Sequence, residues 1–166
     1  MARVVLIGLP GVGKSTVARA LAERWRTDVL DTDEQIAAIV GESASQYLRS
    51  HGEAAFREVE LEALRSALES DVVLACGGGV VTTQRGRELL AGQRTVWLDC
   101  PDDVIVTRLR DGDRPLIGED PDAGVARLRE ERARLYEEVA SCRVDSSGAP
   151  DEVVDRVIAA FNRVSS

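Results

Sequence analysis

The segment Gly8-Leu9-Pro10-Gly11-Val12-Gly13-Lys14-Ser15 decides the fold of this chain, because it fits the phosphate-binding pattern G-x-x-x-x-G-K-[ST]. The apolar run Arg3–Ile7 precedes the segment and is predicted to be a buried strand. The periodic stretch Thr16–Trp25 follows it and is predicted to be a helix. A strand, a glycine-rich turn and a helix in this order are the setting that a phosphate-binding loop requires. A plain turn with a serine helix cap would not need this arrangement of glycines.

The residue types of this loop each have a chemical reason. Glycines allow the backbone N–H groups to turn inward around an anion, and the start of the helix adds the positive end of its dipole. Lys14 is the only lysine of the chain, and a flexible ammonium fits such a loop better than a planar guanidinium. We expect Lys14 to reach the β- and γ-phosphates of a nucleotide and Ser15 to hold Mg²⁺. The predicted nucleotide-binding residues are Gly11, Val12, Gly13, Lys14, Ser15 and Thr16.

Composition predicts one globular domain. The chain has 166 residues, of which 44% are hydrophobic and 30% are charged, as is usual for a single domain of a soluble protein. The formal net charge of −8 argues against non-specific binding of nucleic acid, so an anionic ligand must be held by locally placed positive groups. There is no apolar run long enough to span a membrane, and a strand begins at once, so we expect neither a membrane segment nor a signal peptide.

The cysteines and the histidine predict no chemistry of their own. Cys76, Cys100 and Cys142 are far apart in the sequence, which favours buried apolar thiols in a reducing cytoplasm. His51 is the only histidine, which excludes a metal cluster of histidines or a triad that needs several of them. We expect His51 to face solvent beside Gly52.

Strand-like and helical runs alternate along the chain, which predicts an α/β fold with a parallel sheet covered on both faces. The predicted strands are Val4–Ile7, Asp28–Leu30, Val72–Ala75, Thr95–Leu98 and Cys142–Val144. The predicted helices are Lys14–Trp25, Asp33–Val40, Ala44–Ser50, Glu53–Ser70, Gln84–Leu90, Asp102–Leu109, Asp122–Ala140 and Asp151–Val164. Ligands of such folds bind at the carboxyl ends of the strands, so the functional residues are expected in the segments that follow each strand.

Two of these segments carry unusual residues. Asp31-Thr32-Asp33 follows the second strand, and one carboxylate can approach Mg²⁺ while the other meets a substrate hydroxyl. A helix cap formed by Asp31 or Asp33 is the alternative. Gly77-Gly78-Gly79 follows the third strand and suits a place where a ligand or another segment approaches the backbone, the alternative being a flexible turn.

Two arginines fall in line with the apolar stripes of their helices. Arg57 and Glu60 extend the stripe of Leu61, and Glu60 can hold Arg57 while Arg57 faces an anion. Arg132 falls between Leu128 and Tyr136 of its helix in the same way. Each arginine either looks into a pocket or lays its aliphatic stem over the edge of the core, and helical spacing alone leaves both open.

The polar stretch Arg108–Gly118 has the composition of a mobile lid. Arg114 precedes Pro115, which biases its backbone toward an extended shape, and a lid that closes over phosphates needs an arginine at its edge. The alternative is an ordinary surface loop. Which of Arg108 and Arg110 meets the adenine side of a nucleotide stays open.

Together these residues resemble the shikimate kinases over nearly the whole chain. The motifs that carry the resemblance, besides the phosphate loop, are Asp31-Thr32-Asp33, Gly52-Glu53-x-x-Phe56-Arg57-x-x-Glu60, Gly77-Gly78-Gly79, Arg114-Pro115-Leu116 and Arg132-x-x-Leu135-Tyr136. The resemblance implies the three-layer fold of P-loop nucleoside monophosphate kinases, with a five-stranded parallel sheet and a mobile lid. It also implies one kinase domain over residues 1–166, with a substrate-binding region at about 32–61 and the lid at about 109–121.

The resemblance further implies the reaction, which is ATP-dependent and Mg²⁺-dependent phosphorylation of shikimate to shikimate 3-phosphate in aromatic amino-acid biosynthesis. By the resemblance, Lys14, Asp33 and Arg114 take part in catalysis, Arg114 also contacts ATP, and Ser15 and Asp31 hold the metal. The segment from Val144 to Pro150 resembles the adenine-side loop. We expect a cytoplasmic monomer that binds ATP and shikimate and binds neither nucleic acid nor membranes. The residues implied to bind shikimate are Asp33, Arg57, Gly77, Gly78, Gly79 and Arg132.

Other functions remain as alternatives from the sequence. A different small-molecule kinase, such as a gluconate kinase or a nucleoside monophosphate kinase, is one alternative. Gluconate also offers a carboxylate and hydroxyls, so the two arginines alone do not exclude it. A nucleotide-binding regulatory module that has lost turnover is a third reading. The glycine triplet favours shikimate, and the presence of Lys14, Ser15, Asp31 and Asp33 together favours an active enzyme.

Overall fold

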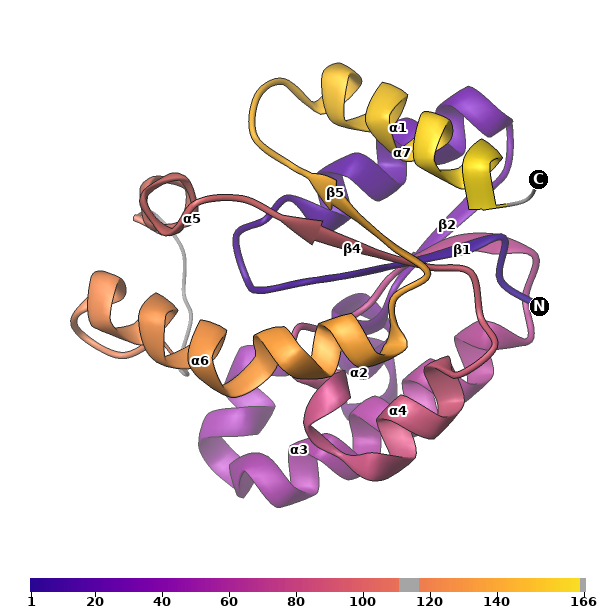
Figure 1. Ribbon diagram of the computed structural model, residues 1–166. Coiled ribbons are helices and arrows are strands. Elements are labelled where there is room, and N and C mark those ends of the chain that lie inside the picture. The colour runs from indigo at the N-terminus through magenta and orange to yellow at the C-terminus, as the bar shows by residue number, and fades with distance from the viewer. Residues whose placement is uncertain (111–116, 165–166) are drawn as a thin grey trace.

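The structure, a computed structural model, describes residues 1–110 and 117–164. Within this part of the chain, five strands form one parallel sheet in the order β2-β3-β1-β4-β5 (Figure 1). The predicted five-stranded parallel sheet is thus confirmed. The strands are β1 (Val4–Ile7), β2 (Asp28–Asp31), β3 (Val72–Ala75), β4 (Thr95–Asp99) and β5 (Cys142–Asp145).

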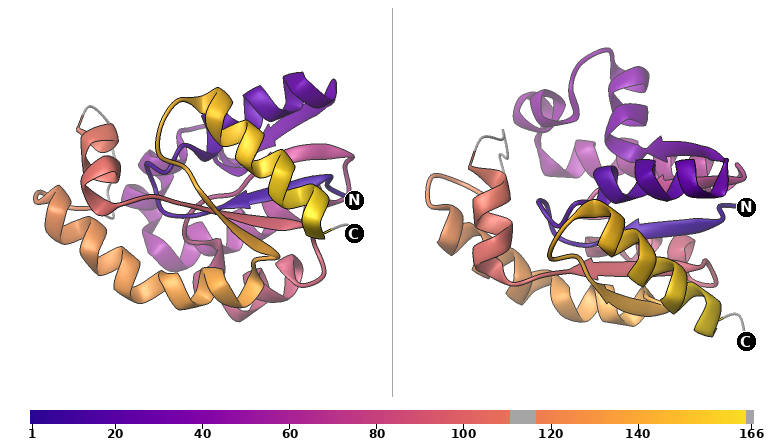
Figure 2. Two further views of the ribbon diagram at one scale, coloured as in Figure 1. Left: turned by 45° about the horizontal axis from the view of Figure 1, so that its top comes forward. Right: turned by 90° about the horizontal axis from the view of Figure 1, so that it is seen from above.

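Helices cover both faces of the sheet, as the α/β pattern predicts. Helices α1 and α7 pack together on one face, and α3, α4 and α6 lie on the other (Figures 1 and 2). The three layers of the predicted fold are therefore present. The helices are α1 (Lys14–Trp25), α2 (Thr32–Val40), α3 (Ala44–Leu68), α4 (Gln84–Leu90), α5 (Asp102–Leu109), α6 (Pro121–Val139) and α7 (Pro150–Val164), with a short 3₁₀ turn η1 (Val80–Thr82) after β3.

Helix α3 is broken at Gly52. Gly52 has φ 84° and ψ 170°, a conformation that residues with a side chain rarely adopt, so the helical hydrogen-bond pattern is interrupted there. The sequence predicts two helices, Ala44–Ser50 and Glu53–Ser70, and the break confirms that division. The first part of α3 packs with α2, and the second part reaches the sheet.

The hydrophobic residues form two clusters. The main core contains the central strands β1, β3 and β4, which are fully buried, whereas β2 and β5 lie at the sheet edges and are partly exposed. A second, smaller cluster consists of the buried residues Ile36, Phe56 and Ala63, with half-buried apolar side chains packed around them. This smaller cluster joins α2 to both parts of α3. Among the described residues, no helix is both long enough and apolar enough to cross a membrane.

The register of the sheet brings three functional segments to one edge. Asp31 pairs with Ala75, and Ala75 pairs with Leu6, so β2, β3 and β1 end at the same level. The phosphate loop, the glycine triplet and the Asp31–Asp33 segment therefore begin side by side, although they are far apart in the sequence. This is the edge at which parallel α/β sheets bind their ligands.

Candidate active site

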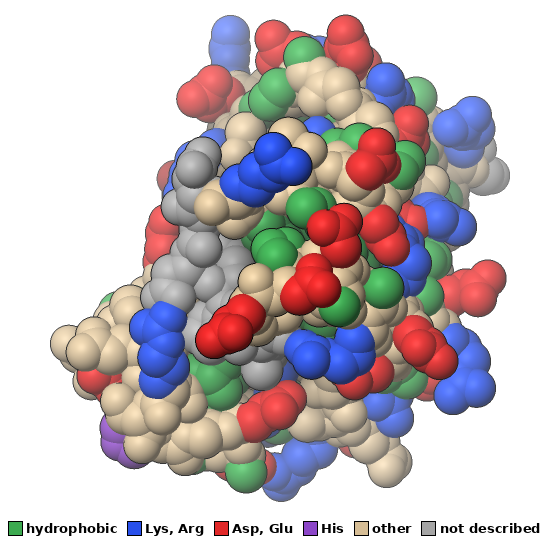
Figure 3. Space-filling view, turned by 90° about the vertical axis from the view of Figure 1, so that its left-hand side faces the viewer, with side chains coloured by type: hydrophobic (Ala, Val, Ile, Leu, Met, Phe, Trp, Pro, Cys, Tyr) green, Lys and Arg blue, Asp and Glu red, His purple; other side chains and the backbone are tan. Residues whose placement is uncertain are grey.

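Two adjoining cavities lie at the carboxyl ends of the strands. The larger has a volume of about 500 Å³ and is lined by residues 10–17 of the phosphate loop and α1, together with Asp31, Asp33 and Arg108. The smaller, of about 90 Å³, is lined by Arg57, Glu60, Arg132 and the glycine triplet. Figure 3 shows this face of the molecule, on which acidic and basic side chains are interspersed with apolar ones. Both cavities share a wall formed by Pro10, Asp33, Ser45, Gly77 and Gly78.

The phosphate loop has the conformation that its glycines permit. Gly8 has φ +146°, and a Cβ there would lie 2.3 Å from the carbonyl oxygen of Leu98, so the loop passes directly over β4. The Nζ of Lys14 donates hydrogen bonds to the carbonyl oxygens of Gly8 (2.8 Å) and Leu9 (2.9 Å). The side chain is thus folded back over the loop, with its charge inside the larger cavity, and this confirms that Lys14 lines it.

Burial shifts the proton equilibrium of Lys14. Removal of water from around the ammonium lowers the pKa of Lys14 from 10.5 to about 8, although the nearby carboxylates of Asp33 and Asp31 act in the opposite direction. The ammonium of Lys14 therefore loses its proton more readily in the ligand-free protein than that of a lysine in water. An anion bound in the cavity would favour its charged form.

The single lysine makes this pKa directly measurable. With ¹³C-labelled lysine, we expect one side-chain NMR signal that titrates near pH 8 in the folded protein and near 10.4 in urea. Between these pH values the unfolded chain binds more protons than the folded one, so Lys14 makes the free energy of unfolding rise with pH over that window. A folded-state midpoint near 10.4 would contradict the burial of this ammonium.

Asp31 serves two purposes at the end of β2. Its Oδ1 accepts a hydrogen bond from the backbone N–H of Asp33 (2.9 Å), which caps α2, so the helix-cap alternative is correct for this residue. Its Oδ2 accepts a hydrogen bond from the hydroxyl of Ser15. The two predicted metal ligands are thus in contact at the phosphate loop. Asp33 lies in the first turn of α2 and lines both cavities.

The glycine triplet is a point of close approach and not a flexible turn. A Cβ on Gly77 would lie 2.5 Å from Oε1 of Glu60, and one on Gly78 would lie 3.0 Å from the carbonyl oxygen of Gly8. The backbone N–H of Gly77 also donates to Oγ1 of Thr32 (2.7 Å), a fully buried side chain. Side chains of the site therefore lie directly against this backbone, which leaves no room for a Cβ.

Arg57 is held inside the smaller cavity. Its Nη1 donates to Oε2 of the buried Glu60 (2.7 Å), and its Nη2 donates to Oε1 of Glu53 (3.2 Å). The Arg57 side chain is only 7% exposed, so it does not lay its stem over the core edge with its charge in solvent. Burial raises the pKa of Glu60, and the charge of Arg57 opposes that rise.

Arg132 lies on the other side of the same cavity. It is 2% exposed, and its Nε has no hydrogen-bond partner among the described residues. One turn farther along α6, the hydroxyl of Tyr136 donates to the carbonyl oxygen of Gly78, and burial raises the pKa of Tyr136 to about 12. Of the two alternatives that helical spacing leaves open for Arg132, the structure therefore favours the one in which it faces a cavity.

Arg108 is the lid-side arginine that lines the larger cavity. Its Nη1 donates to the carbonyl oxygen of Val12 (3.0 Å) and its Nη2 donates to that of Ser146 (2.8 Å). Arg108 therefore joins the phosphate loop to the segment after β5, whose residues Ser146, Gly148 and Pro150 line the same cavity. Arg110 is exposed and does not line it. Arg114, with residues 111–116 of the lid expected at 109–121, lies outside the described residues.

The remaining expectations from the sequence concern the cysteines, the histidine and metal binding. Cys76 and Cys100 are buried and Cys142 is half-buried, and burial raises the pKa of the Cys76 thiol well above its usual value. His51 is half exposed and stacks on the ring of Tyr47, as expected of a solvent-facing histidine. Among the described residues, no group of three histidine, cysteine or carboxylate side chains forms a metal site.

Sequence reasoning missed several residues that complete the site. Thr32 and Tyr136 fix the glycine triplet by hydrogen bonds, and Ser45 lines both cavities. For Thr32, the sequence offers one indication of a role in the site, which is its position between two candidate carboxylates. The roles of Tyr136 and Ser45 depend on the packing of distant segments, for which the sequence carries no local signal.

Comparisons with known proteins agree with this geometry. A family model described as shikimate kinase matches residues 10–162. The shikimate kinase of Streptomyces coelicolor is 43% identical over 158 residues, which cover 93% of this chain and 92% of that protein. The structure of the shikimate kinase from Acinetobacter baumannii in complex with shikimate has a TM-score of 0.91 at 32% identity, covering 96% of this chain and 92% of that one.

A gluconokinase from Sinorhizobium meliloti is also similar in structure, with a TM-score of 0.65 at 21% identity over 97% of this chain and 91% of that one. That likeness concerns the fold alone. The family match, by contrast, runs from the phosphate loop into α7, and it includes α2, α3 and α6, which line the smaller cavity. The chain belongs to the shikimate kinase family.

Proposed function

We propose that this protein transfers the γ-phosphoryl group of ATP to the 3-hydroxyl of shikimate. The observation that carries the proposal is that two buried guanidinium groups, those of Arg57 and Arg132, line a cavity that adjoins the phosphate loop. Shikimate is a carboxylate with ring hydroxyls, and a carboxylate is the group that paired arginines bind best. The proposed substrate-binding region extends over residues 32–61 and includes the glycine triplet and Arg132.

The order of the residues across the shared wall fits this transfer. Arg57 and Arg132 would hold the carboxylate at the far end of the smaller cavity, and Asp33 would meet the hydroxyls where the two cavities adjoin. The hydroxyl oxygen forms a bond to the γ-phosphorus while the bond from that phosphorus to the β–γ bridging oxygen breaks. The hydroxyl proton passes to the carboxylate of Asp33, and ADP leaves. Catalysis then consists of positioning and electrostatic stabilisation, so no cysteine or histidine is needed.

The residues at the loop fit the nucleotide and Mg²⁺. The contact between the hydroxyl of Ser15 and a carboxylate oxygen of Asp31 presents two hard oxygen donors, and Mg²⁺ is commonly bound by one or two such groups together with phosphates and water. When bound, Mg²⁺ would neutralise charge on the phosphates. Lys14, which lines the same cavity, would do the same, and Arg108 and the Ser146–Pro150 segment would border the adenine. A role of Arg114 at the transferring phosphate remains a prediction.

We also propose that the protein acts as a monomer in the cytoplasm. The three cysteines are free, and two of them are buried, which suits a reducing compartment. The net charge of −8 disfavours nucleic acid as a partner.

A coupled assay of ADP release tests the proposed reaction. We expect turnover with shikimate, and values of kcat/KM lower by about 10² or more with gluconate and nucleoside monophosphates. Neither of these acceptors can place a carboxylate at the two arginines and, at the same time, a hydroxyl where that of shikimate lies. NMR of the product should place the phosphate on the 3-hydroxyl. Turnover with gluconate at a similar efficiency, or no turnover with any of the acceptors, would contradict the proposal.

Gly79→Ala should weaken shikimate binding through Arg57. The new Cβ would lie 2.1 Å from Nη2 of Arg57, and this guanidinium is too well held by Glu60 to move without loss of its hydrogen bond. We expect the KM for shikimate to rise about tenfold, the effect of one lost hydrogen bond to a charged group. In an Arg57→Ala background the same change should have little further effect, because the clash is gone. An equal effect in both backgrounds would show that Gly79 acts in another way.

A further inference from the structure

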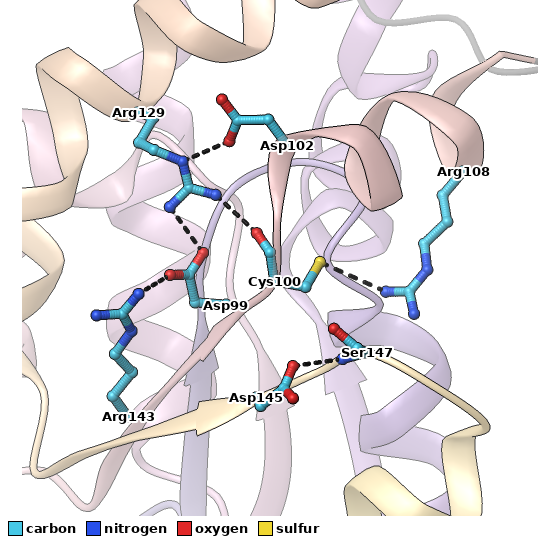
Figure 4. A network of polar contacts seen from close by, with 8 residues as sticks. All are labelled: Asp99, Cys100, Asp102, Arg108, Arg129, Arg143, Asp145 and Ser147. Carbon is cyan, nitrogen blue, oxygen red and sulfur yellow. Dashed lines mark hydrogen bonds and ion pairs between the residues drawn. The ribbon is translucent and has the colours of Figure 1, made fainter.

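A second group of charged residues lies at the carboxyl end of β4, next to the proposed active site. Its centre is Asp99, whose side chain is 5% exposed and binds two arginines (Figure 4). Nη1 of Arg129 donates to Oδ1 of Asp99 (2.9 Å), and Nη2 of Arg143 donates to Oδ2. The two arginines come from different elements, Arg129 from α6 and Arg143 from β5.

Arg129 makes more contacts than its partner arginine. Besides the bond to Asp99, its Nη2 donates to the carbonyl oxygen of Cys100 (2.7 Å) and its Nε donates to Oδ1 of Asp102 (2.5 Å). The three acceptors lie where β4 passes into α5, because Asp99 is the last residue of β4, Cys100 follows it and Asp102 is the first residue of α5. Figure 4 shows the guanidinium of Arg129 directed from its helix toward this connection. One side chain therefore fixes α6 to the connection at three points.

The same connection is tied to the phosphate loop. Gly8 lies against the carbonyl oxygen of Leu98, one residue before Asp99, where even a Cβ would not fit. Arg108 of α5 bonds the carbonyl oxygen of Val12 within the loop. The two elements that the connection joins, β4 and α5, thus both contact the phosphate loop, and Arg129 ties α6 to the same elements.

Arg132 lies three residues after Arg129 on α6, less than one helical turn away. Its buried Nε has no partner among the described residues, so nothing at that atom corrects its position if the helix moves. The place of the Arg132 guanidinium relative to the phosphate loop therefore depends on the position of α6. Two side chains of α6 flank Arg132 and hold this part of the helix by hydrogen bonds, Arg129 three residues before it and Tyr136 four residues after it. Of the two, Arg129 ties the helix to β4 and α5.

We propose that Arg129 is a positioning residue for the shikimate site, which holds Arg132 at the correct distance from the phosphate loop. The proposal rests on the proposed function, because it concerns the binding of the shikimate carboxylate by Arg132. Arg129 does not line either cavity, and so it acts through Arg132 and not on the substrate directly.

Arg143 supplies a matched control. It binds the same carboxylate of Asp99 and stacks over the ring of Trp97, with its guanidinium carbon 4.5 Å from the ring centroid. However, Arg143 is on β5, and within residues 1–110 and 117–164 its side chain has no hydrogen bond to α6. Arg129→Met and Arg143→Met each remove one arginine from Asp99, yet only the first releases α6.

We expect Arg129→Met to raise the Kd of shikimate about five- to twentyfold, with the Kd of a non-hydrolysable ATP analogue changed less than about twofold. Arg129→Lys should recover part of the shikimate affinity, because an ammonium can bond one or two of the three acceptors. Arg143→Met should lower the melting temperature and leave the Kd of shikimate unchanged. Asp102→Asn removes the charge from one exposed acceptor and should raise the Kd of shikimate by a smaller factor, which provides a test if Arg129→Met does not fold.

The double variant separates this proposal from the proposed function. In an Arg132→Lys background, Arg129→Met should cost less than about twofold in shikimate affinity, because its effect is transmitted by the guanidinium that is no longer there. If Arg132→Lys alone leaves the Kd unchanged, the proposed shikimate site is wrong. If Arg132→Lys weakens binding but Arg129→Met does not, or costs the same in both backgrounds, the positioning role is wrong and the site stands.

Discussion

Lys14→Ala is expected to lower kcat for shikimate phosphorylation by about 10² or more while the fold remains intact. Lys14 lines the larger cavity, and its ammonium donates hydrogen bonds to two carbonyl oxygens of its own loop. Its loss therefore removes positive charge at the transferring phosphate and does not remove core packing. Steady-state kinetics with ATP and shikimate measure the effect, and circular dichroism measures the fold.

Lys14→Arg is a sharper companion to this variant. The Nζ of Lys14 lies 2.8 Å and 2.9 Å from two carbonyl oxygens of the loop, so the larger planar guanidinium cannot occupy the same position. We expect Lys14→Arg to recover little of the lost kcat although it keeps the charge. Near-normal kcat in Lys14→Ala with an unchanged circular dichroism spectrum would refute the assignment of the phosphate loop.

Arg132→Lys should weaken shikimate binding by about 1.5–3 kcal/mol, which is roughly 10- to 150-fold in Kd. The lysine keeps the charge but loses the planar fork that binds a carboxylate at two points. The affinity for ATP should hardly change, because Arg132 lines the smaller cavity and not the larger one. Calorimetric titration with shikimate and with an ATP analogue measures both.

Arg134→Lys is the control for this variant, because Arg134 is exposed on the same helix. It should leave both affinities unchanged. If Arg132 were a structural residue only, Arg132→Lys would lower the melting temperature and keep the Kd of shikimate. That result would remove Arg132 from the site and with it much of the support for shikimate as the substrate.

The sequence predicts those parts of the site that depend on short stretches of chain. The phosphate loop is contiguous, and the place of Asp31 and Asp33 follows from their position after a strand. The spacing of apolar residues places Arg57 and Arg132 in line with the apolar faces of their helices, although it does not decide whether their charges are buried. In each case the residue and the pattern that identifies it lie in the same short stretch of chain, so the local sequence is sufficient.

Contacts between distant segments could not be predicted. The bonds from Gly77 to Thr32, from Tyr136 to Gly78 and from Arg108 to Val12 join residues that are 45, 58 and 96 positions apart. They exist because the strands lie in the order β2-β3-β1-β4-β5. Alternation of strands and helices predicts a parallel sheet but leaves this order open, and so the contacts of Arg108 and Arg129 carry no signal in the sequence.

The smaller hydrophobic cluster of Ile36, Phe56 and Ala63 makes the α2–α3 side of the molecule easier for a protease to cleave than the main core. It buries far less apolar surface than the main core, so its local opening costs less free energy than global unfolding. Phe56, Ala44 and Leu48 belong to this cluster or pack on it, and they also form a wall of the smaller cavity. Under the proposed function, shikimate binds against that wall. It binds only while the cluster is packed, so it stabilises the packed cluster against local opening by mass action. The supply of substrate would then determine how long the α2–α3 side of the protein survives a protease.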